Sequence, residues 1–286
     1  MAVSRPNSGE ARRTSLSRSR RPPSLRRLVG RAGFPWVAPT WPTAVDRPAE
    51  HRLGVDYDTE WARRYGARLG RAVLLDDLAR PVLHALARPT VTGLDRIADL
   101  RPPVVLAANH ESHLDTALVL VSLPLHLRHR TVVAGAADYF FDRAWKAAFW
   151  AAAVAAVPVE RHKVNRRSTE LPARLLEEGW NLLIFPEGGR SPDGWTREFR
   201  GGAAYLARRA GCPVVPVHLE GTGAVLGKRR PGLRRGRTRV SFGAPIRPTQ
   251  DDDLRRLAGR IESAVAALAD EAATDWWTAR QRAAAG

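Results

Sequence analysis

The stretch VVLAANHESHLD at positions 104–115 passes from apolar residues directly into polar and titratable ones. Its apolar part predicts a buried strand, and the remainder predicts a loop that leads into a helix. The stretch NLLIFPEGGRS at 181–191 has the same form, an apolar strand followed by a glycine-containing polar loop. Ligands bind outside the carboxyl ends of the strands in open α/β sheets. Two strand ends that carry ionisable side chains therefore favour a functional site at this edge.

Outward from these two stretches, short apolar runs alternate with longer segments of helical periodicity. This alternation predicts an α/β fold, with a mixed, mostly parallel sheet flanked by helices. The strands are predicted near 103–108, 131–134, 181–185, 213–218 and 237–242. The helices are predicted near 114–123, 138–154, 168–178, 198–210 and 251–273.

An N-terminal amphipathic helical pair is predicted before the sheet. Trp61, Tyr65 and Leu69 recur at helical spacing, and the apolar face continues to a break that we expect at Pro81. We divide the chain into a disordered basic arm at 1–56, amphipathic membrane-associating helices at 57–90, the main domain at 91–275 and a C-terminal tail at 276–286.

The composition excludes several classes of protein. The chain has 286 residues, of which 44% are apolar, so it can build a sizeable core and is not wholly disordered. Its single cysteine, Cys212, can form neither an internal disulfide nor a cysteine-built zinc site. The basic N-terminus lacks the apolar core of a signal peptide. The longest apolar run, 147–159, has 13 residues, whereas a membrane-spanning helix needs about 20.

The net charge of +17 implies partners that carry negative charge. Residues 1–50 hold ten Arg, three acidic residues and seven Pro, which is typical of a disordered basic arm. The arm is either a solubilising tail or a segment attracted to an anionic membrane surface. An alternative function is a basic nucleic-acid-binding protein that uses this arm and the basic run 228–239.

His110 and Asp115 are candidates for acid–base chemistry. They stand five positions apart, which is about 140° of rotation in a regular helix, so His110 is expected in the loop and Asp115 in the first helical turn. There the carboxylate can bind the Nδ1 proton, fix the tautomer and raise the basicity of the imidazole. The alternative is that Asp115 only complements the helix dipole.

His110, His113 and Asp115 also form the pattern H-x2-H-x-D, which raises the alternative of a metal-dependent hydrolase. A metal site needs more ligands than these. The HExxH pattern fails because position 114 is Leu, and His162 and His218 fit no ligand spacing. We therefore expect no metal and interpret His113 as a supporting or surface residue.

The second polar loop has the residue types of a phosphate site. Gly188 and Gly189 permit close approach of a ligand to the backbone, and Arg190 offers a planar fork for a phosphate. Glu187 can accept a hydrogen bond from a hydroxyl. The loop could therefore hold a phosphorylated polyol, although the alternative is an ordinary tight turn closed by an ion pair between Glu187 and Arg190.

Four stretches occur together in this chain, namely NHESHLD at 109–115, VER at 159–161, FPEGGRS at 185–191 and CPVVPV at 212–217. In order and spacing they resemble the motif blocks of the glycerolipid acyltransferase family, typified by 1-acyl-glycerol-3-phosphate acyltransferase. The resemblance covers about residues 90–245 and implies an α/β acyltransferase domain on the surface of a membrane. It implies that His110 is the general base and Asp115 its partner. It assigns the acceptor's glycerol-phosphate site to Arg161, Glu187, Gly188 and Arg190, with Gly189 in the same loop.

Two departures from the family pattern concern the acceptor. The third block usually reads EGTRS, and here Gly189 replaces the Thr. A basic pattern such as AKKEL usually follows the second strand, whereas this chain has AGAADY at 134–139. Both changes remove hydrogen-bond donors, and neither touches His110 or Asp115. Acyl transfer to a different lipid acceptor is therefore an alternative.

We predict an O-acyltransferase that moves a fatty acyl group from acyl-CoA or acyl carrier protein to a lysophospholipid hydroxyl. The predicted acceptor is 1-acyl-glycerol-3-phosphate, which would give phosphatidic acid. An acyl thioester is already activated, so a base suffices for direct attack and no cofactor is expected. The absence of a G-x-S-x-G motif, and the place of Cys212 beside Pro213, favour direct transfer over a covalent acyl-enzyme. No nucleic acid is expected as a partner.

The segment 139–150 holds six of the chain's 20 aromatic residues. Phe141, Trp145 and Phe149 recur at helical spacing, which indicates either an interfacial helix at anionic headgroups or a core helix packed on the sheet. The run 228–239 has seven basic residues and no acidic one, and we interpret it as a solvated hairpin with a membrane-facing tip. We expect a peripheral protein on the cytoplasmic face of the membrane.

Overall fold

The computed structural model describes residues 53–160, 166–190, 197–227 and 232–273. Seven strands form one sheet, and their order across it is β1-β7-β6-β2-β5-β3-β4. The strands are β1 (Pro89–Thr92), β2 (Val105–Ala108), β3 (Thr131–Ala136), β4 (Ala156–Val159), β5 (Asn181–Ile184), β6 (Val214–Glu220) and β7 (Thr238–Phe242). Most of the predicted basic arm therefore lies outside the described residues and stays a prediction.

The sheet is mixed and mostly parallel, as the sequence predicts. Strand β2 lies at its centre, parallel to β5 on one side and to β6 on the other. Strand β7 runs antiparallel to β6 and parallel to β1. Because β2, β3 and β5 run parallel, their carboxyl ends meet at one edge, where the two polar loops follow.

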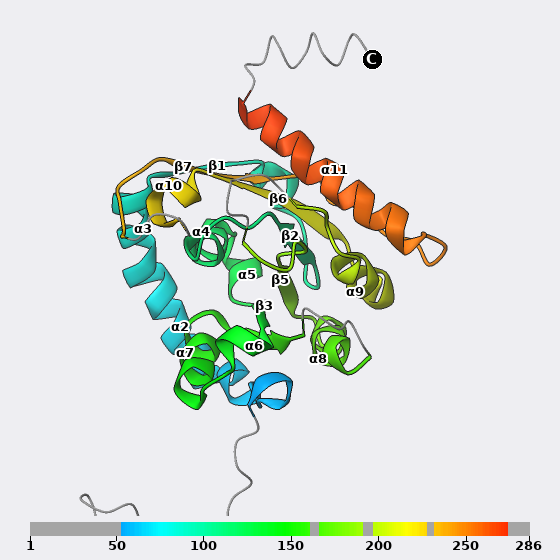
Figure 1. The fold of residues 1–286 in the computed structure, drawn as a ribbon, viewed down its shortest axis with the longest axis horizontal. Coiled ribbons are helices and arrows are strands. Elements are labelled where there is room, and N and C mark those ends of the chain that lie inside the picture. Colours follow the sequence, from blue (N-terminus) through cyan, green and yellow to red (C-terminus); the bar gives the residue numbers. More distant parts are fainter. Residues whose placement is uncertain (1–52, 161–165, 191–196, 228–231, 274–286) are drawn as a thin grey trace, which may run out of the picture. The chain divides into compact units, whose positions relative to one another are not determined.

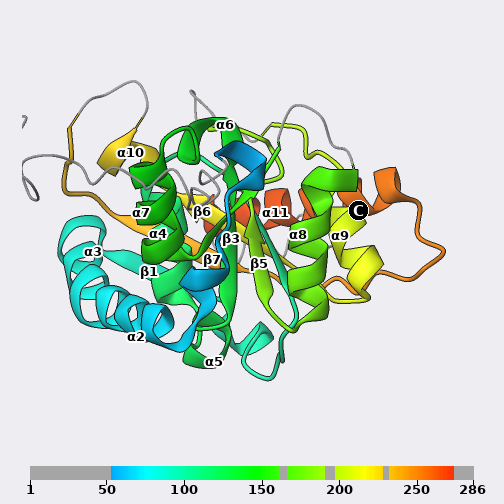
Figure 2. The same cartoon turned by 90° about the horizontal axis from the view of Figure 1, so that it is seen from below.

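Helices cover both faces of the sheet (Figures 1 and 2). They are α2 (Tyr65–Val73), α3 (Arg80–Ala87), α4 (Leu114–Ser122), α5 (Leu125–Arg128), α6 (Ala137–Phe140), α7 (Ala144–Val154), α8 (Arg166–Glu177), α9 (Gly202–Ala210), α10 (Thr222–Leu226) and α11 (Leu254–Ala273). Side chains of α3, α4 and α7 enter one hydrophobic cluster, and side chains of α8, α9 and α11 enter the other.

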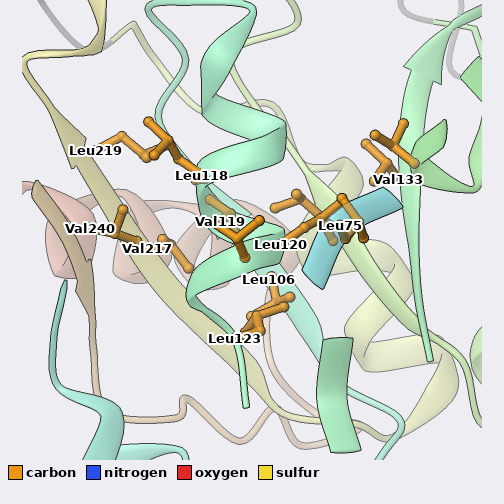
Figure 3. Close-up of a cluster of buried hydrophobic side chains, with 14 of the residues drawn as sticks. Leu75, Leu106, Leu118, Val119, Leu120, Leu123, Val133, Val217, Leu219 and Val240 are labelled. Atoms are coloured by element: carbon orange, nitrogen blue, oxygen red, sulfur yellow. The ribbon is translucent and has the colours of Figure 1, made fainter. Parts of the chain in front are cut away.

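Strand β2 is buried on both faces, because its side chains alternate between the two clusters. Leu106 and Ala108 join the first cluster, whereas Val105 and Ala107 join the second. Figure 3 shows Leu106 among apolar side chains of α4 and of neighbouring strands. A strand covered on both faces reads as a continuous apolar run, which explains the clear signal at 104–108.

The segment before the sheet is helical but does not divide where we expected. Two 3-10 helices, η1 (Gly54–Asp56) and η2 (Glu60–Arg63), precede α2, and a π-helix, η3 (Leu74–Ala79), joins α2 directly to α3. Pro81 falls in the first turn of α3. Proline removes one backbone donor from a helix, and here it stands just after the π-helix, where the α-helical hydrogen-bond pattern is already interrupted. The expected break at Pro81 is therefore wrong, and a separate helical pair is not confirmed.

The predicted helix 138–154 is two helices, α6 and α7. Between them Phe141 turns fully inward, and its ring lies 5.7 Å from that of Tyr57. Strands β1 and β4 were not predicted, and both lie at the edges of the sheet. Within the described residues, no helix combines the length and the apolar character that crossing a membrane requires.

Candidate active site

The loop that follows β2 is anchored to the neighbouring strand β6. Asn109 Nδ2 donates to the Leu219 carbonyl at 2.8 Å, and the Leu219 amide donates to Asn109 Oδ1 at 2.7 Å. This two-way bond replaces a strand pairing at the point where β2 ends. The next residue, His110, therefore leaves the sheet at a fixed position.

His110 is paired with Asp115 at the start of α4. The Nδ1 atom of His110 lies 2.8 Å from Oδ2 of Asp115. The same carboxylate oxygen accepts from the backbone N–H of Glu111 at 2.7 Å and of Ser112 at 2.8 Å. Asp115 is fully buried, so the loop is wrapped around its carboxylate. The dipole interpretation and the catalytic one are thus compatible in a single geometry.

This pairing defines the tautomer of the imidazole. A carboxylate at Nδ1 favours the proton on that nitrogen, which leaves Nε2 as the basic atom. The His110 ring also stacks on Phe185, with centroids 4.1 Å apart and planes inclined by 24°. Ring contact and carboxylate together hold the imidazole in one orientation, as a general base requires.

Glu187 reaches from the end of β5 to the same loop. Its Oε1 accepts from the His110 backbone N–H at 3.0 Å, and its side chain is buried. Burial raises the pKa of Glu187 to about 7, and the bond from the His110 backbone opposes that rise. Glu187 therefore supports the loop of His110, whereas its predicted contact with the acceptor stays a prediction.

The two glycines of the second loop differ in their surroundings. Gly188 has φ of +70°, a conformation that favours glycine. Gly189 has no neighbour within 4 Å of the place where a Cβ would stand. The lost Thr hydroxyl at position 189 therefore corresponds to open space beside the site.

A cavity of about 210 Å³ opens beside these two loops. His110, Gly188, Gly189 and Arg190 line it at its polar end. Its apolar wall comes from the ends of β3, β4 and β5 and from α6 and α7, namely Val133, Ala134, Ala136, Phe140, Trp150, Val154, Ala156, Val159, Ile184 and Phe185. The segment 134–136, where the sequence lacks the expected basic residues, thus forms part of this wall.

The predicted site residues are placed by the fold as follows. His110, Gly188, Gly189 and Arg190 line the cavity, and Asp115 and Glu187 are buried beside His110. Arg161 lies outside the described residues.

Some residues that shape the site were not assigned from the sequence. Phe185 and Glu111 stand inside the quoted stretches, so their position was the available signal. Burial and the nearby Asp115 raise the pKa of Glu111 to about 7. Arg200 also lines the cavity, and no spacing rule pointed to it.

His113 lies close to the His110–Asp115 pair. Its ring stacks on that of Tyr139 at 6.0 Å, and both line the cavity. Burial and the positive charge of Arg190 lower the pKa of His113. Among the described residues, no cluster of three or more His, Cys, Asp or Glu side chains is arranged to hold a metal ion.

Comparison with known proteins supports the resemblance to acyltransferases that the sequence motifs indicate. Residues 88–220 match the family model described as Acyltransferase. The region 88–220 of this chain is therefore similar to the Acyltransferase family, as its sequence motifs indicate.

Several similar proteins are 1-acyl-sn-glycerol-3-phosphate acyltransferases. The chain is 28% identical over 175 residues to the chloroplastic 1-acyl-sn-glycerol-3-phosphate acyltransferase BAT2 of Brassica napus, a match that covers 60% of this chain and 49% of the relative. It is 30% identical over 180 residues to the chloroplastic LPAT1 of Arabidopsis thaliana, a match that covers 60% of this chain and 47% of the relative. The enzyme of Bacillus subtilis is 27% identical over 163 residues, covering 56% and 76%. The chain thus spans about half the length of the plant relatives it matches.

A solved structure shares the fold of this chain. The crystal structure of the 1-acyl-sn-glycerophosphate acyltransferase PlsC from Thermotoga maritima aligns with a TM-score of 0.56. The alignment covers 75% of this chain and 83% of that chain at 23% sequence identity. This similarity supports the α/β architecture.

Proposed function

We propose that the chain transfers a fatty acyl group from an acyl thioester to the free hydroxyl of a lysophospholipid. The proposed acceptor is 1-acyl-glycerol-3-phosphate, and the product is phosphatidic acid. The observation that carries this proposal is the His110–Asp115 pair, with Nδ1 and Oδ2 2.8 Å apart, at the polar end of an apolar cavity. The names of the relatives support the choice of acceptor.

In the proposed reaction, Nε2 of His110 takes the proton of the acceptor hydroxyl as its oxygen attacks the thioester carbonyl. The tetrahedral intermediate then collapses, the carbon–sulfur bond breaks, and the leaving thiolate takes the proton back from Nε2. Asp115 stabilises the imidazolium that exists between the two steps. General-base catalysis of this kind contributes about 10²–10⁴ in rate.

The cavity provides a place for the acyl chain. Its wall is built from aliphatic and aromatic side chains of β3, β4, β5 and α7. An apolar wall excludes water from the thioester, which would otherwise be hydrolysed. The donor is acyl-CoA or acyl carrier protein, and both present the same thioester to His110.

Cys212 supports direct transfer over a covalent acyl-enzyme. Its thiol is buried, and burial raises its pKa to about 11. A thiol in this state holds little thiolate at neutral pH and is a weak nucleophile.

The decisive experiment measures transfer from labelled acyl-CoA and acyl carrier protein to 1-acyl-glycerol-3-phosphate, glycerol 3-phosphate and other lysolipids. We expect label in phosphatidic acid, and a loss of at least about 10² in kcat/KM for His110→Ala. The matched control is His84→Ala, on α3 and away from the cavity lining. Failure of folded wild-type protein with every donor and acceptor, or full activity of His110→Ala, would refute the proposal.

The proposed location is the cytoplasmic face of a membrane, with peripheral attachment. The substrates are lipids, and the net charge of +17 matches an anionic surface. The exposed aromatic side chains of α7 are the proposed apolar contact.

A further inference from the structure

Arg200 is held next to the glycine loop by contacts on both sides. The preceding residue, Phe199, is buried in the second hydrophobic cluster, and its amide donates to Oε2 of Glu262 on α11 at 3.0 Å. The Arg200 amide donates to the Pro186 carbonyl at 3.1 Å. The backbone of Arg200 is therefore fixed to the loop that follows β5.

The guanidinium of Arg200 lies against the backbone of Gly188. A Cβ at position 188 would stand 2.9 Å from Cζ of Arg200 and 3.1 Å from both Nε and Nη1. These three atoms belong to one planar group, so the face of the guanidinium covers the position where a side chain at residue 188 would begin. The absence of a side chain at position 188 makes room for this arrangement.

Arg200 and Arg190 both line the cavity that His110 lines. The charged residues of the described lining are these two arginines and Glu160, so the charge is positive when the histidines are neutral. Arginine presents a planar fork of donors that suits a phosphate, and two forks can share its oxygens. A phosphomonoester carries a charge of about −1.5 to −2 at neutral pH.

We propose that Arg200 is a specificity-determining residue of the acyltransferase site, which together with Arg190 binds the phosphate of a phosphomonoester acceptor across Gly188. The inference rests on the proposed function and names a second arginine for its acceptor. Arg200 supplies guanidinium donors beside Gly188, the residue that precedes Gly189. The acceptor is thereby selected by its phosphate.

Steady-state kinetics test the selection. Arg200→Gln is compared with wild type on 1-acyl-glycerol-3-phosphate and on monoacylglycerol, which lacks the phosphate. We expect KM for the phosphorylated acceptor to rise at least about tenfold, because one charge-assisted interaction is lost. The kcat value is expected to stay within about twofold, and turnover of monoacylglycerol to be unchanged. Equal effects on both acceptors, or no effect, would overturn the proposal.

Direct binding separates this proposal from the proposed function. Calorimetric titration of wild type with glycerol 3-phosphate, using glycerol as reference, is expected to show binding. The Arg200→Gln substitution is expected to lower the affinity for glycerol 3-phosphate at least about tenfold. Arg200→Lys keeps the positive charge without the planar fork and is expected to retain part of the affinity that Arg200→Gln loses. Arg255→Gln, an exposed arginine of α11, removes the same charge and is the control. If Arg200→Gln binds glycerol 3-phosphate more weakly but wild type transfers no acyl group, the phosphate site stands and the proposed reaction is refuted. If Arg200→Gln binds glycerol 3-phosphate as tightly as wild type, the phosphate site is refuted.

Discussion

His110 is oriented by three groups that come from two parts of the chain. Asp115 of α4 holds its ring nitrogen, Glu187 after β5 holds its backbone amide, and Phe185 contacts its ring face. Each contact removes one freedom from the imidazole. A base that is already oriented loses little entropy when the reaction begins, and such pre-organisation is a main source of catalytic efficiency.

Gly188 and Gly189 are adjacent, but substitution at the two positions is expected to change the free energy of unfolding to different extents. Gly188→Ala forces a side chain into φ of +70° and against Arg200, so we expect a loss of about 1–2 kcal/mol in the free energy of unfolding. Gly189→Ala meets open space and is expected to change it by less than about 0.5 kcal/mol. Urea unfolding of both variants checks this pair, and similar losses at the two positions would contradict it.

At the scale of an element, α7 answers the question that its aromatic spacing left open. Its buried residues are mainly alanines, Ala147, Ala151 and Ala153, which let the helix pack closely. Trp145 and Phe149 are 65% and 55% exposed, whereas Phe141 precedes the helix and is buried. Helix α2 contacts α7 through Arg71, whose Nε donates to the Ala152 carbonyl at 2.9 Å. The stripe is therefore divided between core and surface.

The exposed aromatic residues of α7 predict a measurable contribution to lipid binding. Each large side chain gains about 1.5–3 kcal/mol when it leaves water, so the double variant Trp145→Ser, Phe149→Ser is expected to bind anionic vesicles at least about tenfold more weakly. Leu125→Ser, which removes a side chain that is 60% exposed on α5, is the control. Vesicle flotation measures both. Unchanged flotation of the double variant, or an equal loss with Leu125→Ser, would exclude α7 as the lipid contact.

At the scale of the whole molecule, Glu187 joins the loops that follow β5 and β2. Its pKa of about 7 lies above the ordinary 4.5, with burial as the main cause. The folded state therefore binds this proton more tightly than the unfolded state. The contribution of this proton to the free energy of unfolding is fully present below about pH 4.5 and is lost as the pH rises to about 7.

We expect Glu187→Gln to reduce this dependence. The amide oxygen of Gln can still accept from the His110 amide, but it does not titrate. The free energy of unfolding of the variant should therefore fall less than that of wild type between about pH 5 and pH 8. Chemical unfolding across this range, with the exposed Glu198→Gln as control, measures the difference. Parallel pH curves for wild type and Glu187→Gln would show that this carboxyl does not titrate in that window.

The missed strands have a common physical cause. β1 and β4 are the two edge strands, each has four residues, and each contains a proline. An edge strand pairs on one side only, tolerates proline and needs less apolar sequence. In addition, β4 follows the apolar helix α7 almost directly, so periodicity could not separate the two.

The sequence by itself determined the α/β class, the central strands and the two polar loops, because strands buried on both faces require continuous apolar runs. It also determined that His110 and Asp115 meet, since a loop and a first helical turn bring positions five apart together. The tertiary structure alone decided that Glu187 supports His110 and that Arg200 covers Gly188. These contacts join residues that are distant along the chain, and only the parallel pairing of the strands and the packing of α11 place them side by side.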